Sequence, residues 1–362
     1  MPTLKLLADD LTGALDTSAE LVGAFDPLDV VWSVGSLSSG QQSFAIDSGT
    51  RELGPEQAFA TVREVAPQLA GATIAYKKVD SLLRGPWVAE LDACLRTGLW
   101  DACIVAPAFP YQGRLTRAGR QVAREADGRW NAVGDNILHQ LRNRGLEART
   151  GNSASALQSG ISVFDADTDD DLARIAQTGW KFPGRLLWCG SGGLASALAP
   201  GTAVEISGKL KPPVLGVFGS DHPTTAAQLS MCKAATIPSA GIATSIDRIR
   251  QTLASGVALV RLETPGPLSR AEAARRFSLE IAELMRSIDP PRTLLVAGGE
   301  TLKAQMIAIE ARALQVLGRL EPGLPKSVIQ GGPWSGVDVI SKSGAFGLPD
   351  LWSKLLGRNG LI

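Results

Sequence analysis

The sequence has few of the residues that build several common kinds of site. Histidine occurs only twice among its 362 residues, as His139 and His222. This scarcity argues against a Ser-His-Asp hydrolase and against a histidine-rich metal site. Cysteine is also sparse, and no C-x-x-C pair occurs among the four thiols, which are Cys94, Cys103, Cys189 and Cys232. We expect reduced, mostly structural thiols and neither a disulfide framework nor a zinc site.

An excess of charge and a long apolar run are absent as well. The 36 basic and 36 acidic residues give a formal net charge of zero, and no run of Lys or Arg stands out. Neither nucleic acid nor an anionic membrane is therefore an expected partner. No window approaches about eighteen consecutive apolar residues, and two aspartates interrupt the start of the chain, where a signal peptide needs an apolar segment. These absences predict a cytoplasmic protein.

The sequence does contain enough apolar side chains, 44% of its residues, for a large core, and enough length for two domains. Short apolar runs alternate with helical patterns, an order typical of a mostly parallel sheet flanked by helices. We therefore predict an α/β fold in two domains. The expected strands lie at 30–34, 43–46, 73–77, 103–106, 161–164, 186–189, 214–218, 257–261 and 293–297. The expected helices lie at 55–69, 87–97, 224–235, 270–288 and 302–317.

The segment 205–213 breaks this alternation. It contains Ser207-Gly208 and the pair Pro212-Pro213, a composition typical of a linker. We place the domain boundary at about residue 210, so that the N-terminal domain covers 1–210 and the C-terminal domain covers 211–362.

The start of the chain carries the first chemical signal. The apolar run 4–8 ends in Asp9 and Asp10, and a helical pattern follows from Leu11 onward. This order predicts strand, tight turn and helix, and it puts both carboxylates at the carboxyl end of a strand, where ligands bind in open α/β sheets. Two adjacent carboxylates repel one another unless a cation or a substrate hydroxyl lies between them. The structural alternative is that Asp9 caps the helix and Asp10 is solvated.

Several later loops of the first half add positive charge. Arg51 ends the loop 47–51 and has the planar fork that binds carboxylates, although in isolation it is better explained as an exposed loop residue. The loop 77–85 brings three cations, a carboxylate and a hydroxyl into one turn, and charged groups seldom gather at a strand end without an anion to hold. Loops 107–114 and 190–194 add a further arginine and a glycine-rich turn. Together these loops predict a pocket for a small polar acid with hydroxyls.

The second half has glycine-containing turns at 219–222, 297–301 and 342–347. The stretch 297–301 ends a strand and opens a helix, so its backbone amides and the Thr301 hydroxyl are placed for a phosphate on the helix dipole. Neither G-x-x-x-x-G-K-[ST] nor G-x-G-x-x-G after a strand occurs, which excludes a P-loop and weakens a dinucleotide site. Each glycine motif alone is better explained as a tight turn or a helix cap. Three of them in one domain favour nucleotide binding.

Taken in order, these motifs resemble those of the four-carbon acid sugar kinases, a family that includes threonate, erythronate and 3-oxo-tetronate kinases and was once catalogued as a domain of unknown function. The resemblance covers nearly the whole chain. It rests on residues 8–14, 47–51, 78–81 with 83–85, 107–110 with 113–114, 298–301, and 342–344 with 346–347. It implies an N-terminal domain that binds the sugar acid and a C-terminal domain that binds ATP. It further implies an active site in the cleft between them and transfer of a phosphoryl group, with Mg²⁺, to the terminal hydroxyl of the acid.

The resemblance also implies roles for individual residues. One of the two catalytic candidates, Asp9 and Asp10, would accept the proton of the attacking hydroxyl, while the cations of the acid site hold the substrate carboxylate. The expected substrate-binding residues are Asp10, Arg51, Lys78, Val79, Asp80, Ser81 and Arg84. The expected nucleotide-binding residues are Ser220, Gly298, Gly299, Glu300, Thr301 and Gly344, and no protein metal ligand is expected. Departures from the family at Leu82, at Pro86 and in 331–338 bear on which acid is preferred.

Two other functions stay open at this point. An NAD-linked 2-hydroxy-acid dehydrogenase would share the α/β architecture and the acid-binding arginines, but the sequence lacks the glycine fingerprint of that class. A non-catalytic cytosolic sensor would keep the sugar-acid pocket without the chemistry. The oligomeric state is open as well, a homodimer included.

Overall fold

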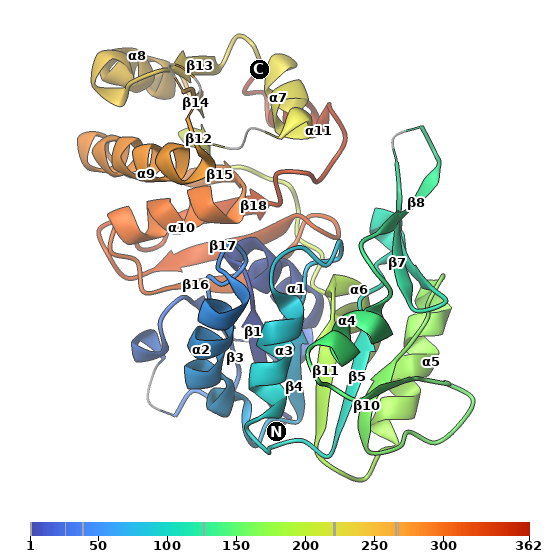
Figure 1. The fold of residues 1–362 in the computed structure, drawn as a ribbon. Helices are drawn as coiled ribbons and strands as arrows, with labels where there is room; N and C mark the ends of the chain where they lie inside the picture. The colour runs from blue at the N-terminus through green and yellow to red at the C-terminus, as the bar shows by residue number, and fades with distance from the viewer. Residues whose placement is uncertain are drawn as a thin grey trace. The chain divides into compact units, whose positions relative to one another are not determined.

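The computed structural model of the protein describes residues 2–25, 27–37, 40–125, 127–219, 222–264, 266 and 268–362. The chain forms two compact units, Met1–Ala203 (unit 1) and Val204–Ile362 (unit 2). In each of them strands alternate with helices (Figure 1). The predicted α/β class, with mostly parallel sheets flanked by helices, is confirmed. The domain boundary expected from the sequence lies a few residues further along the chain than the division between the units.

Unit 1 is built on a parallel sheet in the order β2-β3-β1-β4-β11-β5-β10-β9. In this sheet β1 pairs with β3 on one side and with β4 on the other, with Ala8 beside Asp47 and Leu7 beside Lys77. The loops that follow these three strands therefore leave the same edge of the sheet. The strands are β1 (Leu4–Ala8), β2 (Leu28–Val31), β3 (Phe44–Asp47), β4 (Ile74–Lys78), β5 (Ala102–Ala106), β9 (Ala148–Thr150), β10 (Gly160–Val163) and β11 (Leu186–Gly190).

Helices cover the strands of unit 1, and so β3, β4 and β5 are buried along their whole length. Among these helices, α2 and α3 pack against each other, and α6 packs against both α1 and α5 (Figure 1). The bounds are α1 (Leu11–Phe25), α2 (Pro55–Val65), α3 (Trp87–Leu95), α4 (Ile137–Asn143), α5 (Asp169–Trp180) and α6 (Gly192–Leu198). Three short 3₁₀ turns are η1 (Val34–Ser36), η2 (Ala66–Leu69) and η3 (Pro110–Gln112), of which η2 continues α2 over the predicted helix 55–69.

A small antiparallel sheet in unit 1 was not predicted from the sequence. It has the order β6-β7-β8, with β6 (Arg114–Arg117), β7 (Arg120–Arg124) and β8 (Trp130–Val133). β6 and β7 carry arginine at both ends, and β8 is only four residues long, so they lack the apolar run by which the other strands were found. The turn between β6 and β7 places Ala118 at φ 48° and Gly119 at φ 69°, the left-handed conformation typical of a tight hairpin.

Unit 2 has a parallel sheet in the order β13-β14-β12-β15-β18, which continues with two antiparallel strands, β17 and β16. The strands are β12 (Val214–Phe218), β13 (Thr236–Ser239), β14 (Val257–Leu262), β15 (Thr293–Ala297), β16 (Ala313–Arg319), β17 (Pro325–Gln330) and β18 (Asp338–Lys342). The helices are α7 (Pro223–Ser230), α8 (Ile242–Ala254), α9 (Arg270–Ser287), α10 (Gly299–Ala308) and α11 (Leu351–Arg358).

The prediction of a helix over 302–317 is wrong in its second half. Helix α10 ends at Ala308, and Glu310 then adopts a left-handed φ of 53°. The residues that follow form β16, in which Leu314 and Val316 are fully buried and alternate with less buried neighbours. Buried apolar residues alternate here with a period of two, and β17 is available as an antiparallel partner that the sequence pattern alone does not reveal. The segment therefore forms a strand.

The core of unit 2 is centred on Trp352 of α11, whose ring lies 5.9 Å from that of Phe218. All four cysteines of the chain are free and buried, as expected for structural thiols. Burial raises the pKa of Cys94 and of Cys189 to about 12.

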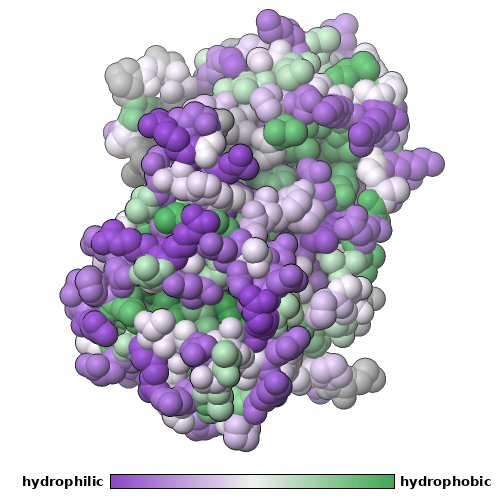
Figure 2. Space-filling view, turned by 90° about the vertical axis from the view of Figure 1, so that its right-hand side faces the viewer, coloured by the Kyte–Doolittle hydropathy of each residue, from purple (hydrophilic) through white to green (hydrophobic). Residues whose placement is uncertain are grey.

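Hydrophilic side chains predominate on the molecular face drawn in Figure 2, with smaller hydrophobic areas between them. Over the described part of the chain, no helix has the length and apolar character needed to cross a bilayer.

Candidate active site

The carboxyl ends of β1, β3 and β4 bring five of the predicted acid-site residues together. Asp9 and Asp10 follow β1, Arg51 lies in the loop after β3, and Asp80 and Arg84 lie in the turn after β4. We call these five residues the Arg51 cluster. The Arg51 guanidinium donates from Nε to Asp9 Oδ2 at 2.5 Å and from Nη2 to Asp9 Oδ1 and Asp10 Oδ1, both at 2.8 Å. Its Nη1 lies 3.4 Å from Asp80 Oδ1.

The ion pairs of this cluster outweigh the cost of burying its charges. Burial by itself would raise the pKa of the Asp9 carboxyl, but Arg51 holds that pKa below its usual value. Asp80 is also buried, and Arg84 and Arg51 together hold its pKa well below the usual range. Both carboxylates are therefore ionised at neutral pH. The two guanidinium groups, which we expected to hold the carboxylate of a bound acid, are already paired with the protein's own carboxylates.

Asp10 caps helix α1. Its Oδ1 accepts a hydrogen bond from Gly13 N at 2.8 Å, and its Oδ2 accepts one from Thr12 Oγ1 at 2.7 Å. The structural alternative drawn from the sequence, with Asp9 as the cap and Asp10 in solvent, is therefore wrong. The Asp10 side chain keeps 13% of its surface exposed, against 2% for Asp9. Asp10 is the carboxylate of the pair that a ligand can reach.

The Lys78 ammonium, at the end of β4, and the Asp10 carboxylate both lie close to Gly13. A Cβ on Gly13 would lie 2.6 Å from Asp10 Oδ1 and 2.7 Å from Lys78 Nζ, so any side chain there would displace these two groups. Within the described part of the chain, no carboxylate forms an ion pair with the Lys78 ammonium. An ammonium group without a direct ion pair and a reachable carboxylate thus lie beside the first turn of α1.

The remaining acid-site candidates belong to the turn after β4. Val79 N donates to Gly190 O at 2.9 Å and so fixes the start of this turn to β11. Asp80 accepts from Arg84 Nε and Nη2, each at 2.7 Å. Leu83 adopts a left-handed φ of 54°, which costs a bulky residue about 1 kcal/mol or more. The contacts of Asp80 therefore hold the turn in a strained conformation.

Sequence reasoning missed three buried polar residues next to this site. Thr50 Oγ1 donates to Glu90 Oε1 at 2.5 Å, and Gln121 Nε2 donates to Ser81 O at 2.7 Å. A signal for Glu90 was present, because it lies three residues after Trp87 and so on the apolar face of its helix. Gln121 had no such signal, because it belongs to the small sheet that the sequence did not reveal.

In unit 2, the predicted nucleotide-binding turns lie on neighbouring strands. β15 pairs with β18, and Gly298 N donates to Lys342 O at 2.9 Å, so the turn 298–301 lies beside the turn that contains Gly344. Gly298 has a φ of 100° and, as the residue before α10, offers the first helical turn no side-chain acceptor. Unpartnered N–H groups at a helix start bind phosphate. Ser220, the other predicted contact, lies outside the described residues.

Helix α7 holds the second of these turns. Thr225 Oγ1 donates to Gly344 O at 2.9 Å, and Gln228 Nε2 donates to Phe346 O at 3.1 Å and to Leu348 O at 3.0 Å. Lys342 is buried beneath the turn, where its Nζ donates to Ser343 O at 3.1 Å and lies 5.9 Å from the Trp352 ring centre. The backbone of this turn is therefore fixed from both sides.

Burial lowers the pKa of Lys342 to about 7, and this gives unit 2 a predictable pH dependence. Between this value and the ordinary lysine pKa of about 10.4, the unfolded chain binds a proton that the folded chain does not, so stability rises with pH across this interval. The variant Lys342→Met should lose this rise, which amounts to at most about 1.4 kcal/mol per pH unit. Urea unfolding at pH 7 and pH 9.5 measures it.

The exposed Lys233 provides the control for this measurement. Lys233→Met should keep the pH dependence of the unchanged protein. An equal slope with pH for Lys342→Met and the unchanged protein would contradict the prediction.

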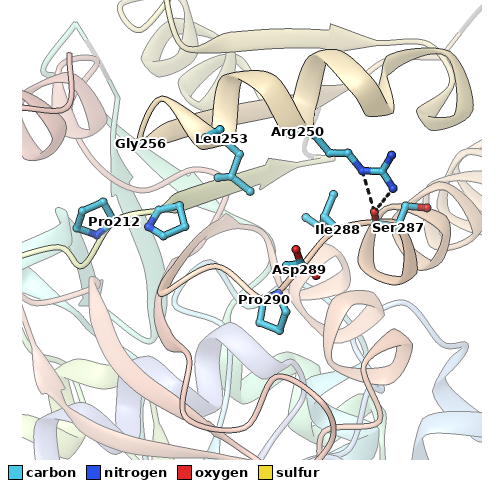
Figure 3. Close-up of a pocket in the computed structure, with 10 residues that line it drawn as sticks. Pro212, Arg250, Leu253, Gly256, Ser287, Ile288, Asp289 and Pro290 are labelled. Carbon is cyan, nitrogen blue, oxygen red and sulfur yellow. Dashed lines mark hydrogen bonds between the residues drawn. The ribbon is translucent and has the colours of Figure 1, made fainter.

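A pocket of about 630 Å³ opens at the other end of the unit 2 strands (Figure 3). Its lining includes Pro212, Leu253 and Pro290, and Arg250 reaches across it to donate from Nε and Nη2 to Ser287 O at 3.1 and 2.6 Å. Strands β12 and β14 begin here, whereas the predicted nucleotide turns follow the ends of strands. The pocket is thus separate from the predicted nucleotide-binding turns of unit 2.

Models of two protein families match the chain. A sugar-binding N-terminal domain matches residues 4–143, which include the whole Arg51 cluster. A nucleotide-binding C-terminal domain matches residues 215–351, which include the turns at Gly298 and Gly344. The two matched segments lie one in each of the two units.

Curated relatives match over almost the full chain. A D-threonate kinase of Cupriavidus necator is 31% identical and covers 94% of this chain and 94% of its own length. A D-threonate kinase of Bordetella bronchiseptica is 28% identical and covers 97% of this chain and 96% of its own length. Among solved structures, a Haemophilus influenzae protein of the family DUF1537 shares the fold, with a TM-score of 0.69 at 18% identity over 98% of this chain and 100% of that chain. The chain belongs to the family of four-carbon acid sugar kinases.

Proposed function

We propose that this chain is an ATP-dependent kinase that phosphorylates the terminal hydroxyl of a four-carbon sugar acid. The observation that carries the proposal is the near full-length match to two D-threonate kinases. It is supported by the ion pairs of the Arg51 cluster, which lies within the segment matched by the sugar-binding model. The cleft between the domains, a cytoplasmic location and a homodimer stay predictions.

In this proposal Asp10 is the residue that accepts the proton of the attacking hydroxyl. It is the more exposed of the two aspartates, and the helix N-terminus and Arg51 keep its carboxylate in place. Asp9 instead is the buried carboxylate that accepts hydrogen bonds from Arg51 Nε and Nη2. Lys78 holds the carboxylate of the acid, because it is the cation of the site that no protein carboxylate pairs with among the described residues.

The nucleotide phosphates are assigned to the turn 298–301 and to Gly344, with Ser220 as a further contact. The uncapped first turn of α10 and the open backbone of Gly298 fit a phosphate group. Mg²⁺ usually binds through substrate phosphates and one or two carboxylates, and the exposed Glu300 is the carboxylate that this turn offers. When bound, the ion neutralises charge that develops on the transferred phosphoryl group.

A coupled ADP-release assay tests the proposal. The substrates are D- and L-threonate, D- and L-erythronate and 3-oxo-tetronate, each with MgATP, and at least one acid should give turnover. Leu82 and Pro86 depart from the pattern of the family. The acid with the highest turnover therefore shows which substrate a site with these residues prefers. Acid binding without ADP release from any of the five would support a sensor, and an acid-dependent change in NADH absorbance would support a dehydrogenase.

Gly85 offers a further test of the acid site. It has a φ of 79°, and a Cβ there would lie 2.8 Å from Arg51 O. Gly98 has a similar φ of 70° but nothing within 4 Å of the Cβ position. Alanine incurs the same left-handed penalty at both positions, about 1 kcal/mol, but only Gly85→Ala displaces Arg51. We expect Gly85→Ala to raise KM for the acid about tenfold or more.

The matched variant Gly98→Ala should keep the KM for the acid of the unchanged enzyme. Steady-state kinetics at saturating ATP compares the two variants. Similar values of KM for both would mean that the backbone of Arg51 does not set acid binding.

A further inference from the structure

A network of polar side chains lies next to the Arg51 cluster, inside unit 1. It consists of Lys77 on β4, Glu90 on α3, and Thr50 and Ser48 in the loop after β3. Lys77, Glu90 and Thr50 are at most 1% exposed. Such groups are rarely buried together without a reason, because each loses its contact with water.

The members of this network are joined by short contacts. Lys77 Nζ lies 2.8 Å from Glu90 Oε2, and Glu90 Oε1 accepts from Thr50 Oγ1 at 2.5 Å. The Thr50 and Ser48 hydroxyl oxygens are 2.8 Å apart, and Ser48 Oγ donates to Ala8 O at 2.8 Å. Lys77 Nζ also donates to Lys78 O at 2.9 Å. The ends of β1, β3 and β4 are thereby tied to α3.

This arrangement fixes the backbone from which the acid site projects. Thr50 N and Arg51 N both donate to Asp9 O, at 3.1 and 3.2 Å. The orientation of Thr50 therefore decides where the Arg51 side chain starts relative to Asp9. Glu90 fixes that orientation through its hydrogen bond with Thr50 Oγ1.

Stability alone does not explain a charged pair at this place. Replacing a buried ion pair by apolar residues of similar volume is often neutral or stabilising, so burial of Lys77 with Glu90 is weak evidence for a stabilising role. Burial opposes the charge on Lys77, but the nearby acidic groups, Glu90 first and then Asp9, together raise the pKa of Lys77 above its usual value. A carboxylate is a stronger acceptor for the Thr50 hydroxyl than a neutral group.

We propose that Glu90 is a positioning residue that sets the affinity for the sugar acid by orienting Thr50 and hence Arg51, and that Lys77 serves as its counter-charge. This inference rests on the proposed function. It assigns a role to a helix residue that does not touch the acid.

Two double variants that differ in one acceptor atom test the inference. Lys77→Met with Glu90→Gln removes both charges but keeps an oxygen for Thr50 Oγ1. Lys77→Met with Glu90→Met has nearly the same volume and removes that oxygen. We expect KM for the acid within about threefold of the unchanged enzyme for the first variant and raised about tenfold for the second, with KM for ATP unchanged in both. Equal values of KM for the acid in the two variants, or an equal rise in KM for ATP, would overturn the inference.

A second pair of variants covers the case in which the double variants do not fold. Thr50→Ser keeps the hydroxyl that Glu90 accepts, and Thr50→Val replaces it by a methyl group of the same shape. Thr50→Val should raise KM for the acid about tenfold, and Thr50→Ser should leave it within about threefold. Equal KM values for Thr50→Val and the unchanged enzyme would overturn the inference.

Thermal stabilisation by D-threonate without nucleotide separates this inference from the kinase proposal, because it needs no turnover. If the unchanged protein binds the acid but releases no ADP, the kinase proposal fails, while the variants still report on positioning. The concentration of D-threonate that gives a fixed increase in melting temperature should then rise about tenfold for Thr50→Val and stay within about threefold for Thr50→Ser. A similar value for both would overturn the inference by a route independent of activity.

Discussion

Asp10→Asn is expected to lower turnover by about 100-fold or more, the usual scale for a positioned acid or base, with the affinity for ATP kept. Asparagine still accepts a hydrogen bond from Gly13 N, because it is among the best residues at a helix start, so the fold of α1 is preserved. What the variant loses is the capacity to take the proton of the attacking hydroxyl. Steady-state kinetics with the best acid, together with ATP titration, measures both parts of the prediction.

The exposed Asp135 provides the control, and Asp135→Asn should leave turnover unchanged. Full turnover of Asp10→Asn would remove Asp10 from the mechanism. Asp9 would then be the remaining candidate. Its carboxylate would have to separate from Arg51 and become accessible during the reaction.

Arg51→Met should cost the protein about 3–5 kcal/mol of unfolding free energy at neutral pH, as the removal of one member of a buried ion pair commonly does. The loss leaves Asp9 buried without its counter-ion and removes the cation that lies against Asp10 and Asp80. Urea unfolding of the variant and the unchanged protein at pH 7 gives the difference. A cost below about 1 kcal/mol, the scale of an exposed ion pair, would contradict this account.

The sign of the pH dependence follows from the carboxylates. In the unchanged protein the pKa values of Asp9 and Asp80 lie below their usual values, so the stability they contribute is present above about pH 4 and is lost as pH falls through the folded pKa values. In Arg51→Met, burial without the cation favours the protonated form of Asp9. The difference in stability between the two proteins should therefore shrink as pH falls from 7 toward 4. A constant difference over this range would mean that the Asp9 contact contributes little.

The main sheet of unit 1, apart from β9, could be predicted from the sequence because its other strands are short apolar runs. The runs that became β1, β4 and β5 have the burial expected of strands covered on both faces. The small sheet β6-β7-β8 could not be found in this way, because β6 and β7 carry arginine at both ends and β8 is only four residues long. The segment 313–319 was misjudged because a run of mixed residues suits helix and strand alike until a partner strand is known.

The residues of the acid site could be grouped from the sequence because parallel strands end at one edge of a sheet, which brings together loops that are far apart along the chain. Their pairing could not be predicted. That Arg51 contacts Asp9, Asp10 and Asp80 depends on the register of β1 with β3 and β4, which sets the loops within hydrogen-bond reach. The role of Glu90 was hidden for the same reason, since its partner Thr50 lies forty positions earlier in the chain.

The four buried thiols divide unevenly between the units, with Cys94, Cys103 and Cys189 in unit 1 and Cys232 in unit 2. Burial raises the pKa of each thiol, so the reactive thiolate is scarce while the chain stays folded. A thiol reagent such as a maleimide would then modify each cysteine only when the surrounding unit opens. Mass spectrometry of the labelled chain could follow the opening of the two units separately, without substituting any residue.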